Sequence, residues 1–217
     1  LRLPAAPAAG GPAQGRLGAM RDGLAAAARS PVLAPVLIAN LAVGVLYVGA
    51  FFVILPLIVR DVYGGGSTEL SLVSLGFWGG TIGSTLVQIR LGALRRPGRA
   101  IVLALVLGAG VLAAMGRPSP FPVFVGLCLV WGLGAGVVMT QARTLVQAAA
   151  PEALRARILA LFQLGLMGGA PVGAVLIGYL AALAGPRGAA VYPAGGMLLV
   201  LAGLLLRSRL WRQGEAR

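Results

Sequence analysis

Long apolar runs separated by short polar breaks dominate the chain. The runs cover residues 33–59, 70–94, 100–116, 121–146, 158–184 and 189–206. A membrane-spanning helix needs about 20 mostly apolar residues, so each run can cross a bilayer, although 100–116 and 189–206 are close to the lower limit. The breaks combine charge with Gly or Pro, which commonly separate helices. We therefore predict an all-α integral membrane protein with six transmembrane helices.

The composition supports lipid as the solvent for this chain. Hydrophobic residues make up 59% of the sequence and charged residues only 11%, whereas a soluble domain carries about 25% charged residues. All the acidic residues lie in or beside the breaks or in the two ends of the chain, namely Asp22, Asp61, Glu69, Glu152 and Glu215. None lies deep inside an apolar run, where an ionised group is costly.

The basic residues, all arginines, divide unevenly between the two sides of the predicted membrane domain. If the N-terminus is cytoplasmic, the inner segments hold 15 of the 18 arginines, and the outer loops hold only Arg60, Arg117 and Arg187. The positive-inside rule then places both termini in the cytoplasm of a multi-pass protein in the plasma (inner) membrane. We expect no nucleic-acid partner, because the arginines lie between apolar runs and not on one binding face.

The two ends of the chain are predicted to lie outside the membrane. Residues 1–15 are rich in Pro, Ala and Gly, a composition typical of a linker. Residues 16–29 fit either a short basic helix on the membrane surface or a continuation of the linker. The predicted domains are therefore a cytoplasmic linker over 1–30, a six-helix transmembrane domain over 31–207 and a cytoplasmic tail over 208–217.

An internal repeat connects the second and fifth apolar runs. Residues 76–87 read GFWGGTIGSTLV and residues 165–177 read GLMGGAPVGAVLI, so both contain G-x-x-G-G followed by another glycine. The two segments have opposite orientations in the predicted topology, which indicates two inverted three-helix repeats. The alternative role for these glycines is close helix packing, which we favour and which is compatible with a repeat.

Two loops resemble elements of the major facilitator superfamily. Residues 92–99, GALRRPGR, are similar to the signature G-x-L-x-D-R-x-G-R-R between the second and third helices of each half. The Asp is absent and the loop is one residue shorter, as is usual in the second half of such chains. Residues 151–158, PEALRARI, are similar to P-x-x-x-R-G-R-V before the eleventh helix of exporters, with Ala156 in place of Gly.

The branch that the chain most resembles is the siderophore-exporter and drug-efflux group. The resemblance implies half of a twelve-helix fold, here the C-terminal half with the central linker, which works with a missing N-terminal half or a second subunit. It also implies secondary-active efflux of a small amphipathic molecule by alternating access in membrane lipid. No cofactor, metal or catalytic residue is expected.

Two other functions stay open at this point. The first alternative is a transport-incompetent membrane fragment or scaffold. The second is a membrane enzyme, which we disfavour because the sequence has no histidine and no acidic residue deep in an apolar run.

The resemblance places the substrate cavity on the first two helices of each three-helix unit. The candidates near mid-membrane are Asn40, Tyr47, Phe51, Trp78, Thr81, Trp131, Gln163 and Met167. Four residues of the first run, Asn40, Gly44, Tyr47 and Phe51, would share one face of an α-helix. Aromatic and Met side chains suit a large, variable apolar substrate, whereas packing is the alternative for each residue singly.

The two resembling loops supply candidates for gating. These are Gly92, Arg95, Arg96, Gly98, Arg99, Arg155 and Arg157. The arginines lie at the predicted cytoplasmic ends of the helices, where they would contact lipid phosphate or close an inner gate.

Overall fold

The computed structural model describes residues 16–92 and 94–207, and its regular elements in these ranges are all helical. They are α1 Arg16–Arg29, α2 Leu33–Ala42, η1 Val43–Val48, α3 Gly49–Asp61, α4 Ser67–Leu91, α5 Pro97–Met115, α6 Phe121–Ala149, η2 Glu152–Leu154 and α7 Arg155–Arg207. Within the described ranges, 5 helices are long and apolar enough to cross a membrane, counting α2, η1 and α3 as one. The prediction of an all-α membrane protein is confirmed at this level.

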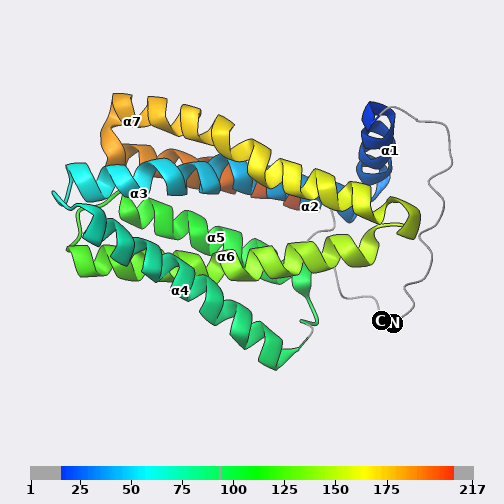
Figure 1. The fold of residues 1–217 in the computed structure, drawn as a ribbon, viewed down its shortest axis with the longest axis horizontal. Helices are drawn as coiled ribbons and strands as arrows, with labels where there is room; N and C mark the ends of the chain where they lie inside the picture. Colours follow the sequence, from blue (N-terminus) through cyan, green and yellow to red (C-terminus); the bar gives the residue numbers. More distant parts are fainter. Residues whose placement is uncertain (1–15, 93, 208–217) are drawn as a thin grey trace, which may run out of the picture.

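Helix α7 turns back on itself at Gly185. Its 53 residues would extend roughly 80 Å as one straight helix, more than twice the hydrocarbon thickness of about 30 Å. Gly185 has φ 73° and ψ 166°, a positive-φ conformation that breaks the helix. Figure 1 shows the ribbon reversing direction there. The predicted runs 158–184 and 189–206 therefore lie on two antiparallel legs of α7, 155–184 and 186–207.

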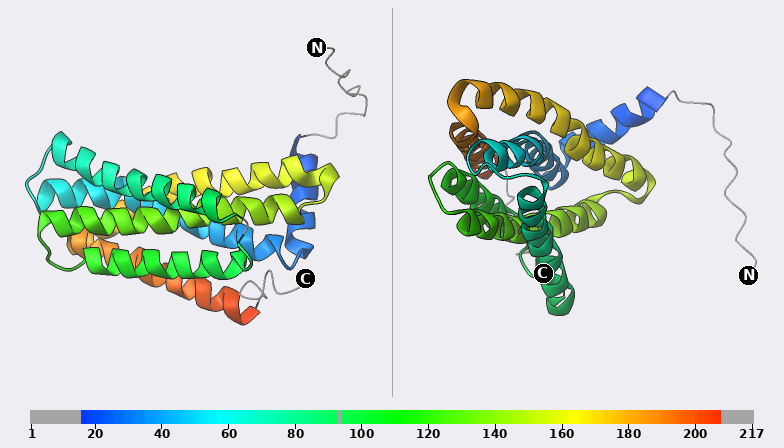
Figure 2. Two further views of the ribbon diagram at one scale, coloured as in Figure 1. Left: turned by 90° about the horizontal axis from the view of Figure 1, so that it is seen from below. Right: turned by 60° about the vertical axis from the view of Figure 1, so that its left-hand side comes forward.

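The long helices run side by side, as Figures 1 and 2 show. The α3–α4 loop, the α5–α6 loop and the turn at Gly185 lie at one end of the bundle. Helix α1 and the connections that come after α4 and α6 lie at the other end. The loops therefore fall into two groups, which match the two sides predicted from the arginines.

Helix α1 packs across the beginning of α7. Gly23 and Ala27 of α1 are buried, and a Cβ atom added to Gly23 would lie 3.3 Å from Cβ of Arg157. The sequence fits either a helix or a linker over residues 16–29, and the structure has a helix there. Its place on a membrane surface stays a prediction, and residues 1–15 and 208–217 lie outside the described part.

Close approaches between backbones organise the bundle into two helix pairs. Helix α4 packs on α6, where a Cβ atom on Gly80 would overlap the carbonyl oxygen of Leu129 and one on Gly132 would overlap that of Phe77. The first helix of the bundle, made of α2, η1 and α3, packs on α7, where a Cβ atom on Gly49 would lie 2.6 Å from the carbonyl carbon of Gly173. Glycine permits such approaches because it has no side chain, so these glycines have the packing role that we favoured.

Buried amides connect α4 to α6 near the end that also carries α1. The Nε2 atom of Gln141 donates to Oε1 of Gln88 at 2.7 Å. Nε2 of Gln88 donates in turn to the carbonyl oxygen of Gly136 at 3.3 Å. In lipid, polar side chains must find partners within the protein, and this pair does so between two helices.

At the opposite end, Tyr63 joins three connections. Its hydroxyl donates to the carbonyl oxygen of Ser119 in the α5–α6 loop at 2.8 Å. Its ring packs edge-on against Phe121 with 5.3 Å between centroids, and the guanidinium of Arg187 lies 5.8 Å from the ring centroid. The three loops predicted to lie outside therefore meet in one small cluster.

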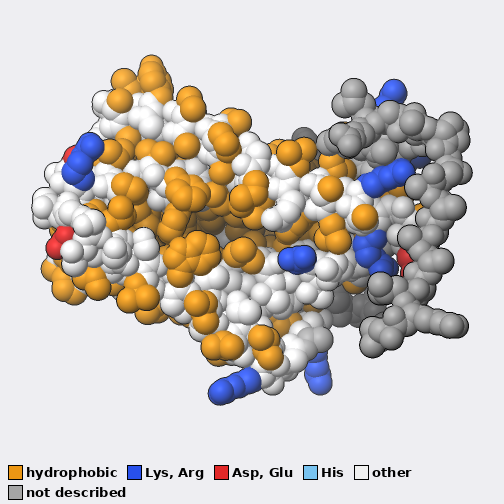
Figure 3. All heavy atoms as spheres, viewed as in Figure 1, with side chains coloured by type: hydrophobic (Ala, Val, Ile, Leu, Met, Phe, Trp, Pro, Cys, Tyr) orange, Lys and Arg blue, Asp and Glu red, His pale blue; other side chains and the backbone are white. Residues whose placement is uncertain are grey.

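Much of the outer surface of the bundle is apolar (Figure 3). Val175 and Leu206 on α7 are 77% and 87% exposed, and many other large aliphatic side chains are also exposed. Soluble monomers rarely expose continuous apolar patches of more than a few hundred Å². Exposure of apolar side chains to water is unfavourable, whereas their contact with lipid tails is not. This surface therefore suits a lipid environment.

Candidate substrate cavity

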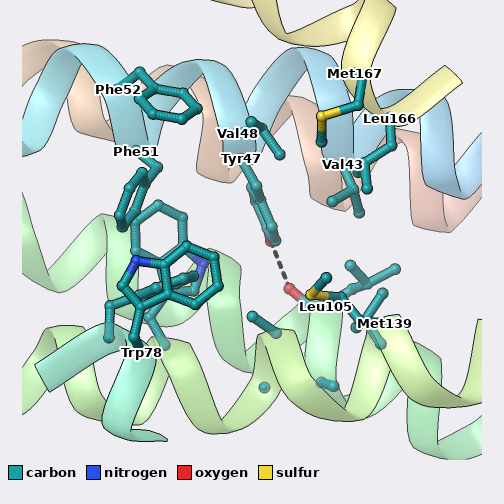
Figure 4. Close-up of a pocket in the computed structure, with 16 residues that line it drawn as sticks. Val43, Tyr47, Val48, Phe51, Phe52, Trp78, Leu105, Met139, Leu166 and Met167 are labelled. Atoms are coloured by element: carbon teal, nitrogen blue, oxygen red, sulfur yellow. Dashed lines mark hydrogen bonds between the residues drawn. The ribbon is translucent and has the colours of Figure 1, made fainter. Parts of the chain in front are cut away.

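An aromatic pocket of about 160 Å³ lies between the first helix, α4, α5, α6 and α7 (Figure 4). The ring of Phe51 lies 4.6 Å from that of Phe77 and 6.2 Å from those of Trp78 and Trp131, measured between centroids. The lining residues are Val43, Tyr47, Val48, Phe51, Phe52, Phe77, Trp78, Ala104, Leu105, Trp131, Gly134, Ala135, Val138, Met139, Leu166 and Met167. This lining suits a flat apolar group, because aromatic rings attract one another edge-on or offset.

A larger, more polar pocket of about 460 Å³ adjoins the aromatic one. The two share Val43, Val138, Met139, Leu166 and Met167. The polar pocket adds Asn40, Thr81, Thr85, Thr140, Arg143, Thr144, Gln147, Phe162 and Gln163. The face drawn in Figure 3 is hollowed near its middle, with hydrophobic side chains around the hollow. Together the pockets form one groove that is apolar at one end and polar at the other.

Tyr47 lies between the aromatic pocket and the backbone of α5. Its hydroxyl donates to the carbonyl oxygen of Leu105 at 2.6 Å, and Figure 4 draws this bond. A Cβ atom on Gly108 would lie 2.8 Å from Cε2 of Tyr47, so the ring lies close against the glycine. The Tyr47 ring also meets Trp131 edge-on at 5.9 Å. The polar end of this tyrosine is therefore satisfied within the protein, and its ring contributes to the lining.

The prediction that Asn40, Gly44, Tyr47 and Phe51 share one face of an α-helix is wrong. Residues Val43–Val48 form a π-helix, which widens the turn by about one residue and rotates the residues after it relative to an α-helix. Asn40 and Gly44 lie against α7: Nδ2 of Asn40 donates to the carbonyl oxygen of Phe162 at 2.6 Å, and a Cβ atom on Gly44 would lie 2.5 Å from that of Leu166. Tyr47 and Phe51 point instead toward α4, α5 and α6.

All eight cavity candidates line one of the two pockets. Tyr47, Phe51, Trp78, Trp131 and Met167 line the aromatic pocket, and Asn40, Thr81, Gln163 and Met167 line the polar one. Asn40, Tyr47, Thr81 and Trp131 are buried, whereas Trp78, Gln163 and Met167 are exposed. Contact of any of them with a substrate stays a prediction.

Besides Tyr47, two of the buried candidates already have a structural role. Asn40 bonds to α7, and Oγ1 of Thr81 donates to the carbonyl oxygen of Gly132 in α6 at 3.1 Å. Both side chains hold helices together, which is the alternative that the sequence also offered. The exposed candidates Trp78, Gln163 and Met167 have more surface free for a ligand.

The gating candidates lie at the end of the bundle that carries α1. Gly92 ends α4 with φ 73°, and Pro97 begins α5 after Arg96. Gly98 is buried, Arg95 and Arg96 are exposed, and Arg99 is partly buried. Arg155 and Arg157 are exposed at the start of α7. The structure brings both loops to one end, and a gating role stays a prediction.

Sequence reasoning missed several residues of the groove. Phe77 contacts both Phe51 and Trp131, yet only its neighbour Trp78 is a candidate from the sequence. Arg143 lines the polar pocket, although a charge near the end of a run is expected to reach for the interface. The signal that could have found it is its spacing: Arg143 lies one helical turn after Met139 on α6.

The comparisons with known proteins identify the family. The model of the transmembrane secretion effectors, a family of the major facilitator superfamily, matches residues 4–217. No curated protein and no solved structure matched the chain. The family match covers nearly the whole sequence, and members of this superfamily are transporters and not enzymes. The chain therefore belongs to the transmembrane secretion effector family of the major facilitator superfamily and is a multi-pass membrane transport protein.

Proposed function

We propose that the chain forms one wall of the substrate pathway of a secondary-active exporter for a small amphipathic molecule. The observation that supports this most is the groove made by the aromatic and polar pockets. A drug-like or siderophore-like molecule with an apolar body and a polar end would match its two ends. The family match supports membrane transport in general, and the groove supports the amphipathic substrate.

The groove needs an opposing wall. Trp78 and Met167 line it yet are 50% and 55% exposed. Such side chains become covered when a second helical unit closes over them. We propose that this unit is an N-terminal half or a second subunit, and that the substrate binds between the two walls.

Two inverted three-helix repeats explain the pairing of the helices. Gly80 and Gly169 occupy the same position in the G-x-x-G-G motifs, and each lies against the first helix of the other unit: Gly80 against Leu129 of α6, and Gly169 3.0 Å from the nitrogen of Val45, measured from an added Cβ atom. Gly79, at the preceding motif position, has no neighbour within 4 Å. The middle helix of each unit thus packs on the first helix of the other unit, as two inverted repeats would arrange them. Each leg of α7 then counts as one span, which gives six spans in all.

The two ends of the bundle suit an inside and an outside. We propose that the end with α1, Arg95, Arg99 and Arg155 faces the cytoplasm of the inner membrane, as the arginine distribution predicts. The loops at this end would then form the inner gate, and alternating access would open the groove to each side in turn.

Efflux from cells tests this proposal. Cells that express the chain together with its opposing half should lose preloaded amphipathic fluorescent dyes faster than cells without it. Phe51→Ala and Trp78→Ala should slow efflux several-fold, because they remove groove surface. Tyr179→Phe is the control, since Tyr179 is exposed and lines neither pocket. Equal efflux by the pocket variants and the control would reject the groove as the substrate path.

A further inference from the structure

The charge inside the groove is of one sign. Arg143 lines the polar pocket, and no acidic residue lines either pocket in the described ranges. Of the acids whose side chains the structure describes, Asp61 and Glu69 lie beside the α3–α4 loop, and Glu152 lies in η2 before α7. A ligand that occupies the polar pocket therefore meets a guanidinium with no carboxylate beside it in the lining.

The neighbours of Arg143 are chiefly hydrogen-bonding groups. Thr140, Thr144 and Gln147 flank it on α6, Thr85 faces the pocket from α4, and Gln163 from α7. The hydroxyls of Thr85 and Thr144 already donate to the carbonyl oxygens of Thr81 and Thr140. The side-chain amides of Gln147 and Gln163 and the hydroxyl of Thr140 can donate hydrogen bonds to the oxygens of an anion. A guanidinium adds a rigid fork of donors that matches a carboxylate, sulfonate or phosphate.

The distance between the two ends of the groove sets the shape of the ligand. Trp131 in the aromatic pocket and Arg143 in the polar pocket are both on α6, 12 residues apart, which is roughly 18 Å along a helix. Val138 and Met139 lie between them and line both pockets. A ligand can therefore place an apolar body among the rings and its head group near Arg143 without leaving the groove.

We propose that the groove selects anionic amphiphiles, with the head group on Arg143 and the apolar body on Phe51, Trp78 and Trp131. This inference rests on the proposed function and specifies its substrate class. A cationic molecule of the same shape is disfavoured, because Arg143 repels it and no acid among the described lining residues compensates. A neutral analogue loses the charge-assisted hydrogen bonds to the guanidinium.

Binding to the full chain together with its opposing half, in phosphatidylcholine nanodiscs, tests the proposal. The probes are a dansyl-labelled undecanoic acid, its primary amide and the corresponding amine, which share one apolar body. Energy transfer from tryptophan to the dansyl group reports saturable binding, because Trp78 and Trp131 line the aromatic pocket. The acid should bind roughly tenfold more tightly than the amide, the usual scale for a hydrogen bond to a charged group. The amine should bind most weakly.

Variants at one position assign the preference to Arg143. Arg143→Gln should reduce the advantage of the acid over the amide to near one, and Arg143→Lys should retain part of it because the positive charge stays. Arg90→Gln is the matched control, because Arg90 is exposed on α4 and lines neither pocket. It should leave the preference unchanged. An acid preference that survives in Arg143→Gln would overturn the assignment.

The outcomes separate this inference from the proposed function. Saturable binding of all three probes with equal affinity would overturn the anion selectivity and leave the groove as a substrate site. No saturable binding of any probe would overturn both. Anionic lipid is a second source of the same head-group chemistry, so the titration is repeated in discs with phosphatidylglycerol. Weaker binding of the acid there identifies lipid as a competing ligand at Arg143, and unchanged binding assigns the site to the soluble amphiphile.

Discussion

At the scale of single residues, the groove depends on polar groups that find partners away from the ligand. Tyr47 places its ring in the lining and its hydroxyl on the carbonyl oxygen of Leu105, at 2.6 Å. A buried hydroxyl without a partner would be costly in a low-dielectric interior. The bond to α5 therefore fixes the position of a ring that also meets Trp131.

Replacing Tyr47 with Phe should lower the free energy of unfolding by about 1 kcal/mol, because the ring stays and only the hydrogen bond is lost. Unfolding in mixed micelles of mild detergent and SDS measures this. Tyr179→Phe is the control, because Tyr179 is exposed on α7 and should have no measurable effect. A Tyr47→Phe protein as stable as the control would show that the bond to Leu105 contributes nothing.

The sequence could predict which residues line the groove better than what each of them does. Trp78 and Trp131 are candidates because they are aromatic and lie near the middle of their apolar runs, and both line the aromatic pocket. Asn40 is predicted on the same stripe as Tyr47, but it bonds to Phe162 of α7. An amide in an apolar run indicates that a partner exists. Which helix supplies the partner depends on tertiary packing, which a single sequence does not contain.

At the scale of helices, glycines decide how closely α4 and α6 approach. Neighbouring glycines in the same motif differ sharply: a Cβ atom on Gly80 would overlap the carbonyl oxygen of Leu129, whereas one on Gly79 would have nothing within 4 Å. Two helices in lipid gain stability mainly by close van der Waals packing. The approach at Gly80 is therefore a main contact of this pair.

The same substitution at these two positions should give opposite results. Gly80→Ala should destabilise the protein by about 1–3 kcal/mol, because the backbones must move apart. Gly79→Ala should be neutral or stabilise the helix by up to about 1 kcal/mol, since Ala is the better helix former. Unfolding in mixed micelles compares the two. Equal effects would contradict the packing described for α4 and α6.

The π-helix at Val43–Val48 shows where the sequence stops being informative at this scale. A stripe at α-helical spacing can be drawn on the first run, but nearly every residue there is apolar, so the pattern does not determine the period of the helix. The wider turn keeps both Gly44 and Gly49 against α7, although an α-helix would place residues five apart on different faces. The wider turn becomes apparent only from the packing of the first helix against α7. The helix ends, in contrast, could be predicted to within a few residues from the breaks rich in Gly, Pro and charge.

At the scale of the whole molecule, the arginine distribution and the fold agree on two distinct ends. The α3–α4 loop, the α5–α6 loop and the turn at Gly185 meet at one end through Tyr63. These are the connections with one arginine each, Arg60, Arg117 and Arg187. The turn at Gly185 is what makes the two legs of α7 antiparallel, and it decides whether the second leg returns to the arginine-rich side.

Cysteine labelling in intact cells can trace the chain across the membrane. Cys128 is buried, so it should give little background with a membrane-impermeant maleimide, and the unmodified chain is the control. Ser119→Cys and Ala184→Cys should be labelled from outside, because they lie at the Tyr63 end of the bundle. Ala153→Cys, which is exposed in η2, should be labelled only after the cells are permeabilised. A C-terminal epitope tag should likewise be detected only after permeabilisation.

Each result decides one part of the topology. Outside labelling at Ala184→Cys, together with inside positions for Ala153→Cys and the C-terminal tag, requires both legs of α7 to cross the membrane, which gives six spans. An outside tag would mean that the second leg does not return, and five spans would then be correct. Outside labelling of Ala153→Cys would reverse the whole orientation and place Arg95 and Arg155 outside, against the charge rule. The orientation of the bundle also determines which side of the membrane lies nearer to the Arg143 end of the groove.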